Sequence, residues 1–456
     1  MSAIKKKNDK IQSKYIKNYY ISTKTEKTPD EDEHAEIVEA EAKPSGSAES
    51  KYVKHGASKE IRFDFNITNP IICIGIAGVI FAVYLLANSG AGYRLGLPNI
   101  NYYLALSLPV ILYLSRKYIY FSKKLLPVYV ALGAFACSIF ISFTMKLDYS
   151  WMINMLAMVT PPLTASFIGY STKCIKYTSY AYIAMSLFFV IDYAVGGITA
   201  GWNGNTIGVY TLLGVVWLVF LGAERGKRNI ALEIVVFVVS VTQMLVTDCR
   251  SVLVSIIALA AFMYLVPKYL MMKKLFFRLV YLVVLLLPIF IVLFYVWLWR
   301  SPYAADLDKW SLEQTEKLFF SGREELWSRV FDFVKEPFFG NGSPSFMGNN
   351  THSSFVLLFI QIGYSGYFLL SIYLMCIFEF LHKFFDDHIV RGSFIAFITV
   401  YISSAFENII VEPRFLCIPA FLTLAVGVGR ACFLEKQQKE KEAPSDVQYY
   451  NTGIQF

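Results

Sequence analysis

Charge is scarce in this chain of 456 residues. Charged residues make up 17% of the sequence, whereas 56% of the residues are hydrophobic and 16% are aromatic. A water-soluble domain carries roughly a quarter charged residues, so an ordinary soluble protein is excluded. The composition predicts an all-α polytopic membrane protein with most of its mass in the lipid bilayer. Binding of nucleic acid is excluded as well, because the basic residues lie in short loops rather than on one amphipathic face.

Motifs for metal or nucleotide chemistry are also scarce. The seven cysteines are scattered and none forms a CxxC pair, so they predict neither a disulfide framework nor a zinc site. The segments expected outside the cytoplasm contain no HExxH, no glycine-rich phosphate loop and no GxSxG. We therefore expect no metal and no cofactor, and a nucleotide sugar held by a metal ion is disfavoured as the substrate.

The sequence instead contains many long apolar runs. Twelve stretches of the sequence are apolar and long enough to cross the hydrocarbon core of a bilayer, which predicts about twelve transmembrane helices. They cover residues 68–88, 101–116, 124–144, 150–170, 177–195, 206–222, 229–247, 251–267, 275–298, 353–380, 391–410 and 412–431.

The loops between these runs predict the orientation. Lysine and arginine gather in every second loop, beginning with the lysine-rich N-terminal segment, and such loops stay in the cytoplasm. Both termini are therefore expected to be cytoplasmic. Residues 1–66 read as a disordered tail because they are polar and poor in apolar residues. A membrane domain over 67–434 and a C-terminal tail over 435–456 follow.

The one long connection, residues 299–352, is then predicted to be extracytoplasmic. It contains "SGREELWSRVFDFVKEPFFGNG", in which Ser321 and Glu324 fit a capping box. Apolar residues recur at helical spacing from Leu326 to Val334, and the glycines that follow end the pattern. The sequence predicts an amphipathic helix lying on the outer membrane face.

Two arginines of this face are candidates for chemistry. Arg250 is expected at the outer interface, where an arginine near hydrocarbon is costly unless it is paired or hydrated. The alternatives are snorkelling or pairing with Asp248. Arg323 lies in the first turn of the predicted helix, where it and the helix N-terminus would bind an anion such as phosphate. The alternative is that Glu324 and Glu325 compensate its charge.

His352 is the one histidine expected on the outer face, and it can act as a general base near neutral pH. Helix capping, shared with Thr351 or Ser353, is the alternative. Clustered arginines beside lipid favour an anionic lipid-linked donor. Glu407, Glu412 and Arg414 are further candidates in this cluster, and the alternative for them is that they pair with one another. Further candidates for binding a diphosphate or a glycan are Arg300, Arg329, Trp327, Glu324, Glu407 and Arg414.

The order of these motifs resembles that of the O-antigen ligase and polysaccharide polymerase superfamily. Its members show an Arg-x-x-x-Trp helix, a Pro-x-x-Gly-x-Gly turn, a histidine and a span with Gly-x-x-Gly, preceded by a Ser-Arg step. The matching residues here are Arg323 and Trp327, Pro337, Gly340 and Gly342, His352, Gly363 and Gly366, and Arg250 within "TDCRS". The chain departs from the family in having His352-Ser353 where His-Asn is usual.

The resemblance implies a glycosyltransferase C-like enzyme in the bacterial cytoplasmic membrane. Such enzymes use a polyprenyl-diphosphate-linked oligosaccharide at the outer face, without nucleotide or metal. Arg250 and Arg323 would hold the diphosphate, and His352 would activate a hydroxyl of the growing glycan acceptor, with inversion at the anomeric carbon. A chain-length regulator is a further candidate partner.

Three functions remain open on the sequence. A repeat-unit polymerase for O-antigen, capsule or exopolysaccharide is favoured, because the departure at His352-Ser353 resembles the divergent polymerases. An O-antigen ligase or O-oligosaccharyltransferase of the same superfamily is the first alternative. A lipid-linked oligosaccharide flippase, which Pro161-Pro162 would suit, is the second. Transporters place polar groups near the bilayer midplane, and the predicted spans are almost free of charge there.

Overall fold

The computed structural model describes residues 122–146, 172–197, 199, 202–221, 229–247, 249–315, 319–320, 322–334, 337–342, 351–411 and 417–442. Every regular element in these residues is a helix, and none is a strand. All of them belong to one unit, Asp64–Phe456. The predicted all-helical fold is confirmed for this part of the chain. The N-terminal tail, the residues after 442 and the spans predicted at 68–88, 101–116 and 150–170 lie outside the described residues.

Three of the described helices are long and apolar enough to cross a membrane. They are α5 (Leu126–Lys146) with the 3₁₀ turn η3 (Lys123–Leu125) before it, α12 (Lys274–Trp299) and α15 (Ser354–His382). The described helices therefore indicate a membrane protein, because a helix of about 20 apolar residues spans the hydrocarbon core.

The other predicted spans within the described residues also fall on helices. Four of these positions are held by shorter apolar helices, at Gly204–Phe220, Ile230–Val246, Arg250–Leu265 and His388–Ser403. The bounds are α7 (Thr172–Ala194), α8 (Gly204–Val215) continued by η4 (Val216–Phe220), α9 (Ile230–Val246), α10 (Arg250–Ala260) continued by the π-turn η5 (Ala261–Leu265), α11 (Lys268–Met271), α16 (His388–Ser403) and α17 (Cys417–Glu442).

One face of α12 is buried and the opposite face is exposed. Phe277, Val284 and Val292 recur at helical spacing on its buried face and pack against the neighbouring helices. Leu279 and Phe290 lie on the opposite face, which is exposed and apolar over its whole length. A stripe of this kind is unfavourable in water, so it fits contact with lipid.

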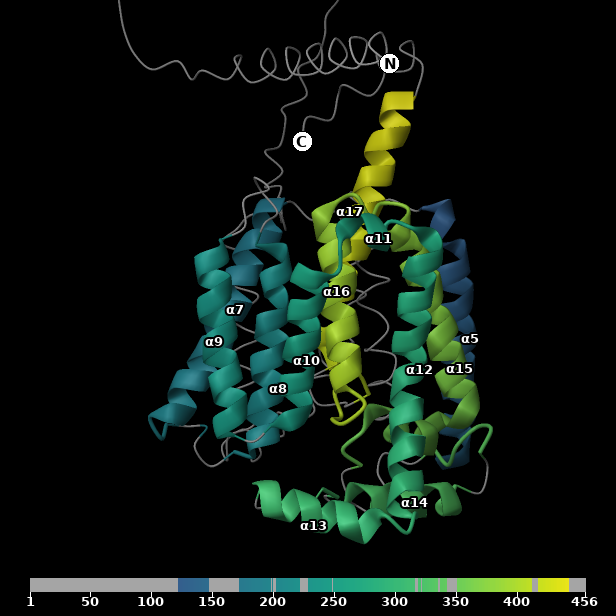
Figure 1. Ribbon diagram of the computed structural model, residues 1–456. Coiled ribbons are helices and arrows are strands. Elements are labelled where there is room, and N and C mark those ends of the chain that lie inside the picture. The colour runs from purple at the N-terminus through teal and green to yellow at the C-terminus, as the bar shows by residue number, and fades with distance from the viewer. Residues whose placement is uncertain are drawn as a thin grey trace, which may run out of the picture. The chain divides into compact units, whose positions relative to one another are not determined.

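Two helices lie across the end of α12 rather than alongside it: α13 (Ala304–Thr315) and α14 (Arg323–Phe333) (Figure 1). The predicted amphipathic helix is thereby confirmed as α14. Its apolar face, with Trp327 and Val330 fully buried, packs onto Val296 of α12 and Ile360 of α15. This packing attaches α14 to the ends of two apolar helices.

The predicted start of α14 needs a correction. The N-cap residue of α14 is Gly322, in the left-handed conformation with φ 83°, one residue after the Ser321 that the capping box predicts. Ser321 lies outside the described residues. Glu324 still reaches back as in a capping box, since its Oε1 accepts a hydrogen bond from the Gly322 backbone N–H at 2.8 Å. The positive φ favours glycine here, which the capping-box pattern does not consider.

α15 is broken in its first half. Gly363 has φ 63° and ψ −159°, outside the helical region. The segment 337–342 fills the break: the Asn341 N–H donates to the Ile360 carbonyl at 2.7 Å, and the Tyr364 N–H donates to the Pro337 carbonyl at 2.9 Å. The two glycine motifs of the sequence therefore meet in space. A kink with this cause needs no proline, because backbone groups released by the break find new partners.

Candidate active site

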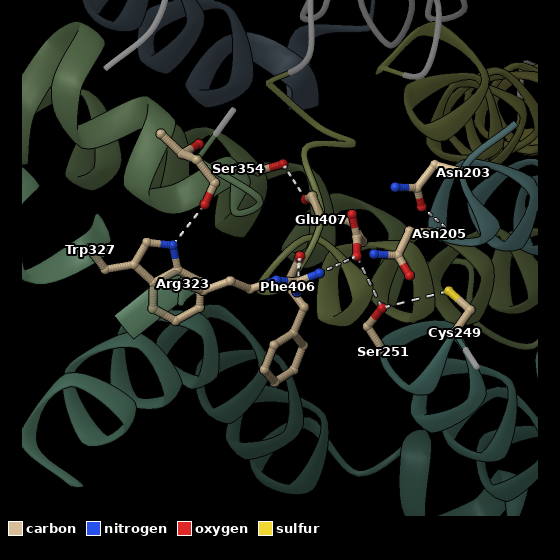
Figure 2. A network of polar contacts seen from close by, with 10 residues as sticks. Asn203, Asn205, Cys249, Ser251, Arg323, Trp327, Ser354, Phe406 and Glu407 are labelled. Atoms are coloured by element: carbon tan, nitrogen blue, oxygen red, sulfur yellow. Dashed lines mark hydrogen bonds and ion pairs between the residues drawn. The ribbon is translucent and has the colours of Figure 1, made fainter. Parts of the chain in front are cut away.

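Arg323 connects α14 to the turn that follows α16. Its Nη1 donates to the Phe406 carbonyl at 2.8 Å, and its Nη2 lies 3.1 Å from Glu407 Oε1 (Figure 2). The Arg323 side chain is 18% exposed and that of Glu407 is 9% exposed. The Coulomb attraction within an ion pair this well shielded from water is stronger than that within a surface pair. Arg323 thus projects from the first turn of α14 toward the other helices instead of toward solvent.

The turn that carries Glu407 is held by the start of α15. The Ser354 hydroxyl accepts hydrogen bonds from the backbone N–H groups of Ile409 at 2.8 Å and Ile410 at 3.1 Å, and donates to the Glu407 carbonyl at 3.1 Å. The Ser354 N–H donates to the Ser404 carbonyl at 3.0 Å. The buried Ser354 therefore holds the backbone of the turn that carries Glu407.

His352 lies in the short connection that enters α15. Thr351, on its N-terminal side, is held by a hydrogen bond: Trp327 Nε1 donates to the Thr351 carbonyl at 2.7 Å. On its C-terminal side Ser353 is the N-cap, and its hydroxyl accepts from the Val356 N–H at 3.5 Å. Capping is thus done by Ser353. His352 is the described non-glycine residue with a positive φ, 51°, a strained conformation that surrounding contacts must maintain.

The charges of this region act on one another. Burial, and then the positive charge of Arg323, lower the pKa of His352, which favours the neutral imidazole that a general base requires. Burial raises the pKa of Glu407 even though Arg323 lowers it. The site therefore combines a shielded cation, a neutral imidazole and a carboxylate whose negative charge is costly without Arg323.

The start of α10 adds further groups. The Ser251 hydroxyl lies 3.4 Å from Glu407 Oε1, and Cys249 Sγ lies 3.9 Å from Ser251 Oγ. Burial raises the pKa of Cys249 to about 11, so the thiol stays protonated and is a poor nucleophile. Arg250 is the first residue of α10 and is exposed. The Tyr295 hydroxyl of α12 interacts electrostatically with both Arg250 and Arg323. The two arginines therefore lie near the same end of α12.

Two predicted binding arginines lie outside this cluster. Arg300 hydrogen-bonds Ser328 and lies 3.9 Å from Asp332, and Arg329 pairs with Glu325 one turn before it. Arg329 is 68% exposed, so its pair contributes little to stability. These contacts lie along α14 itself and its junction with α12. Arg414, Glu412 and Asp248 lie outside the described residues.

The carboxylates near α14 do not form a metal site in the described residues, where no group of three or more histidine, cysteine or acidic side chains gathers. An Asp-x-Asp sequence does occur on α13, at Asp306 and Asp308. Residues two positions apart on a helix do not face each other. Asp308 moreover accepts a hydrogen bond from the Phe320 N–H at 2.9 Å, so it serves to anchor the connection between α13 and α14.

Arg323, His352, Glu407 and Trp327 were predicted from the sequence, whereas Ser251 and Ser354 were not. Ser251 directly follows Arg250, and Ser354 follows the cap of α15. Serine at either place is ordinary at a helix start, so neither position carries a distinctive signal. Their roles depend on a turn more than 50 residues away in the chain.

Replacing Trp327 by phenylalanine is expected to lower the free energy of unfolding by about 1 to 3 kcal/mol, because the buried Thr351 carbonyl loses its donor. Thermal unfolding of the protein in detergent measures this. The matched control is Trp310→Phe on α13, where the side chain is 58% exposed and a change of under about 0.5 kcal/mol is expected. Equal effects of the two substitutions would contradict a special role for the indole hydrogen bond.

No protein-family model, no curated protein and no solved structure matches this chain. The motif resemblance to the O-antigen ligase and polysaccharide polymerase superfamily therefore stays a prediction.

Proposed function

We propose that this protein is a membrane glycosyltransferase that uses a lipid-diphosphate-linked glycan as its donor. The observation that carries the proposal is the shielded Arg323–Glu407 pair at the ends of apolar helices, with His352 within electrostatic range of Arg323. A shielded arginine there offers the forked donor that a phosphate prefers. The donor's lipid would lie along the apolar helices while its diphosphate reaches the arginines.

The proposed reaction assigns one role to each side chain. Arg250 and Arg323 bind the diphosphate and stabilise the charge that develops as the bond between the anomeric carbon and the phosphate oxygen breaks. His352 takes the proton from the acceptor hydroxyl as that oxygen bonds to the anomeric carbon. Attack from the face opposite the leaving group inverts the anomeric centre. The leaving electrons remain on the polyprenyl diphosphate.

Glu407 is proposed to hold Arg323 in place before the donor arrives. The carboxylate and a diphosphate are both anions, and both bind the same guanidinium. Because burial makes the charge of Glu407 costly, giving up Arg323 to the donor favours its protonation. The Arg323–Glu407 pair is thus a resting arrangement that the donor replaces.

Among enzymes of this kind, a repeat-unit polymerase of the bacterial cytoplasmic membrane is our first choice, with a ligase as the second. The two enzymes share the proposed chemistry and differ in the acceptor, and the departure at His352-Ser353, which resembles the divergent polymerases, favours the polymerase. The growing glycan is the acceptor of a polymerase, whereas a ligase transfers the finished glycan to another molecule. A flippase is the rival from another class, and it would need no general base at His352.

The test is mass spectrometry of the lipid-linked glycans in cells that lack this protein. Single repeat units exposed at the outer face are expected for a polymerase. Long lipid-linked polymer that never reaches an acceptor would indicate the ligase. Single units retained on the cytoplasmic side would overturn the enzyme proposal in favour of a flippase.

Replacing His352 by alanine is expected to lower kcat by about 10²-fold or more, with a much smaller change in KM, since the residue moves a proton and does not bind the donor. In the wild-type protein the rate should fall as the pH drops through the pKa of His352. That midpoint is expected below 6.5, the usual value, because burial and Arg323 lower it. Steady-state rates from pH 5 to 8 measure both effects. A midpoint above the usual value would contradict this role.

A further inference from the structure

A second polar site lies at the other end of the same helices. A cavity of about 510 Å³ opens between the first turns of α5 and α12 and the last turns of α15. From Arg278 at this cavity, α12 runs to Trp299 beside the candidate active site, about 30 Å at 1.5 Å per residue. That length matches the hydrocarbon core of a bilayer. The cavity and the candidate active site therefore lie at opposite faces of the membrane.

Cations outnumber anions in the lining of this cavity. Lys124, Arg278 and Lys383 line it, against the single carboxylate of Glu379. Glu379 is already engaged, since it accepts hydrogen bonds from Arg278 Nε at 2.6 Å and Nη2 at 3.0 Å, and from the Tyr281 hydroxyl at 2.9 Å. This bidentate pair holds the Arg278 guanidinium at the cavity and leaves the charges of both lysines uncompensated within the lining.

The two lysines differ in their surroundings. Lys383 is exposed, and among the described residues no carboxylate forms an ion pair with it. Lys124 lies 3.5 Å from Glu435, but that carboxylate does not line the cavity and is also bound by Lys439 at 3.2 Å. The cavity therefore presents a surplus of positive charge to any ligand that enters it.

The rest of the lining is apolar. Pro127 of α5 is exposed, and Ile372 and Met375 of α15 are partly buried. These residues lie on the side of the cavity toward the membrane interior, about one turn from Lys124 along α5 and two to three turns from Lys383 along α15. A ligand that fills the cavity thus meets positive charge at one end and hydrocarbon at the other.

We propose that this cavity binds the phosphate headgroup of an anionic glycerophospholipid, with its acyl chains against Pro127 and Met375. Basic pockets between membrane helices on the cytoplasmic side suit such headgroups, because that leaflet is negatively charged. The predicted orientation places this end of α12 and α15 in the cytoplasmic leaflet. The site is separate from the proposed glycosyl transfer and does not depend on it.

The test uses the full-length protein in a neutral detergent, titrated with phosphatidylglycerol and followed by native mass spectrometry. Binding of phosphatidylglycerol is expected, with little binding of phosphatidylcholine. Lys383→Gln is expected to weaken it roughly fivefold, and Lys124→Gln with Lys383→Gln more strongly, since each basic residue near the surface contributes to attraction of anionic lipid. Lys273→Gln is the matched control: it removes the same charge at the start of α12, outside the cavity lining.

Three results would overturn the proposal. Wild-type affinity in the double variant would mean that the lipid does not use these lysines. Equal weakening by Lys273→Gln would mean attraction to the basic surface as a whole. Binding of inorganic phosphate alone as tightly as phosphatidylglycerol would mean that the apolar wall plays no part and that the ligand is not a lipid.

Discussion

Replacing Arg323 by alanine is expected to lower glycan transfer by about 10²- to 10³-fold, the usual effect of removing one group that stabilises a developing negative charge. The side chain is shielded and bonds two acceptors of the turn after α16, the Phe406 carbonyl and the Glu407 carboxylate, so its loss removes a fixed cation from the proposed donor site. Transfer from a lipid-diphosphate donor in reconstituted vesicles measures the loss. Arg323→Lys keeps the charge but not the forked geometry, and an intermediate loss is expected.

Two further variants separate loss of chemistry from loss of folding. Arg323→Ala leaves Glu407 buried without its partner, which is destabilising. Arg323→Ala combined with Glu407→Gln removes that charge, and it should fold as the wild type does while remaining inactive. Lys309→Ala, which removes an exposed cation from α13, the helix before α14, should keep activity within about twofold. Wild-type product from Arg323→Ala would remove Arg323 from the mechanism. An equal loss in Arg300→Ala or Arg329→Ala would assign the donor to another cluster.

Gly340→Ala should destabilise the fold more than any other single glycine-to-alanine change tested beside it. Gly340 has φ 73°, and an added Cβ would lie 2.6 Å from the Gly363 backbone nitrogen and 2.7 Å from that of Ile362. Backbone cannot move aside as a flexible side chain can. Strain at the positive φ and the steric clash together predict a loss of about 2 to 5 kcal/mol in the free energy of unfolding. Thermal unfolding in detergent measures it.

The chain supplies its own graded controls. At Gly322, φ is 83° and no heavy atom lies within 4 Å of an added Cβ, so alanine there tests strain alone, about 1 kcal/mol. At Gly133, in the exposed part of α5, there is neither strain nor contact, and alanine is expected to be neutral or to stabilise by about 0.5 to 1 kcal/mol. The order Gly340, Gly322, Gly133 is the prediction. A loss at Gly340 no larger than that at Gly322 would contradict close packing of the segment 337–342 on the α15 break.

Several features of the fold follow from local pattern. The apolar run 275–298 becomes α12. In a helix every backbone N–H and C=O group is hydrogen-bonded internally, and the apolar side chains pack against other helices or face lipid. The recurrence of Trp327 and Val330 at helical spacing becomes the buried face of α14. Such features depend on residues that are close together in the chain, so they can be predicted from the sequence.

Other features involve partners that local pattern does not display. Compensation of the Arg323 charge by Glu324 and Glu325 was the alternative to anion binding, but the guanidinium bonds Glu407, 84 residues away in the chain. Histidine capping of α15 was an open alternative, and the adjacent Ser353 does it instead. Both outcomes depend on which helix ends meet, and many pairings of helix ends satisfy the same apolar pattern.

The sequence by itself determined that the chain is helical and rich in membrane-length apolar runs, that an amphipathic helix follows α12, and that Arg323 and His352 are the residues to examine. Helix formation and burial depend on the periodicity and transfer energy of nearby side chains, which can be read directly. Only the tertiary structure decided that Glu407 neutralises Arg323, that Ser354 positions the turn, and that the turn at Gly340 fills the break at Gly363. These contacts join segments that are distant in the chain. They depend on how the helices pack against one another and not on the local conformational preference of any residue.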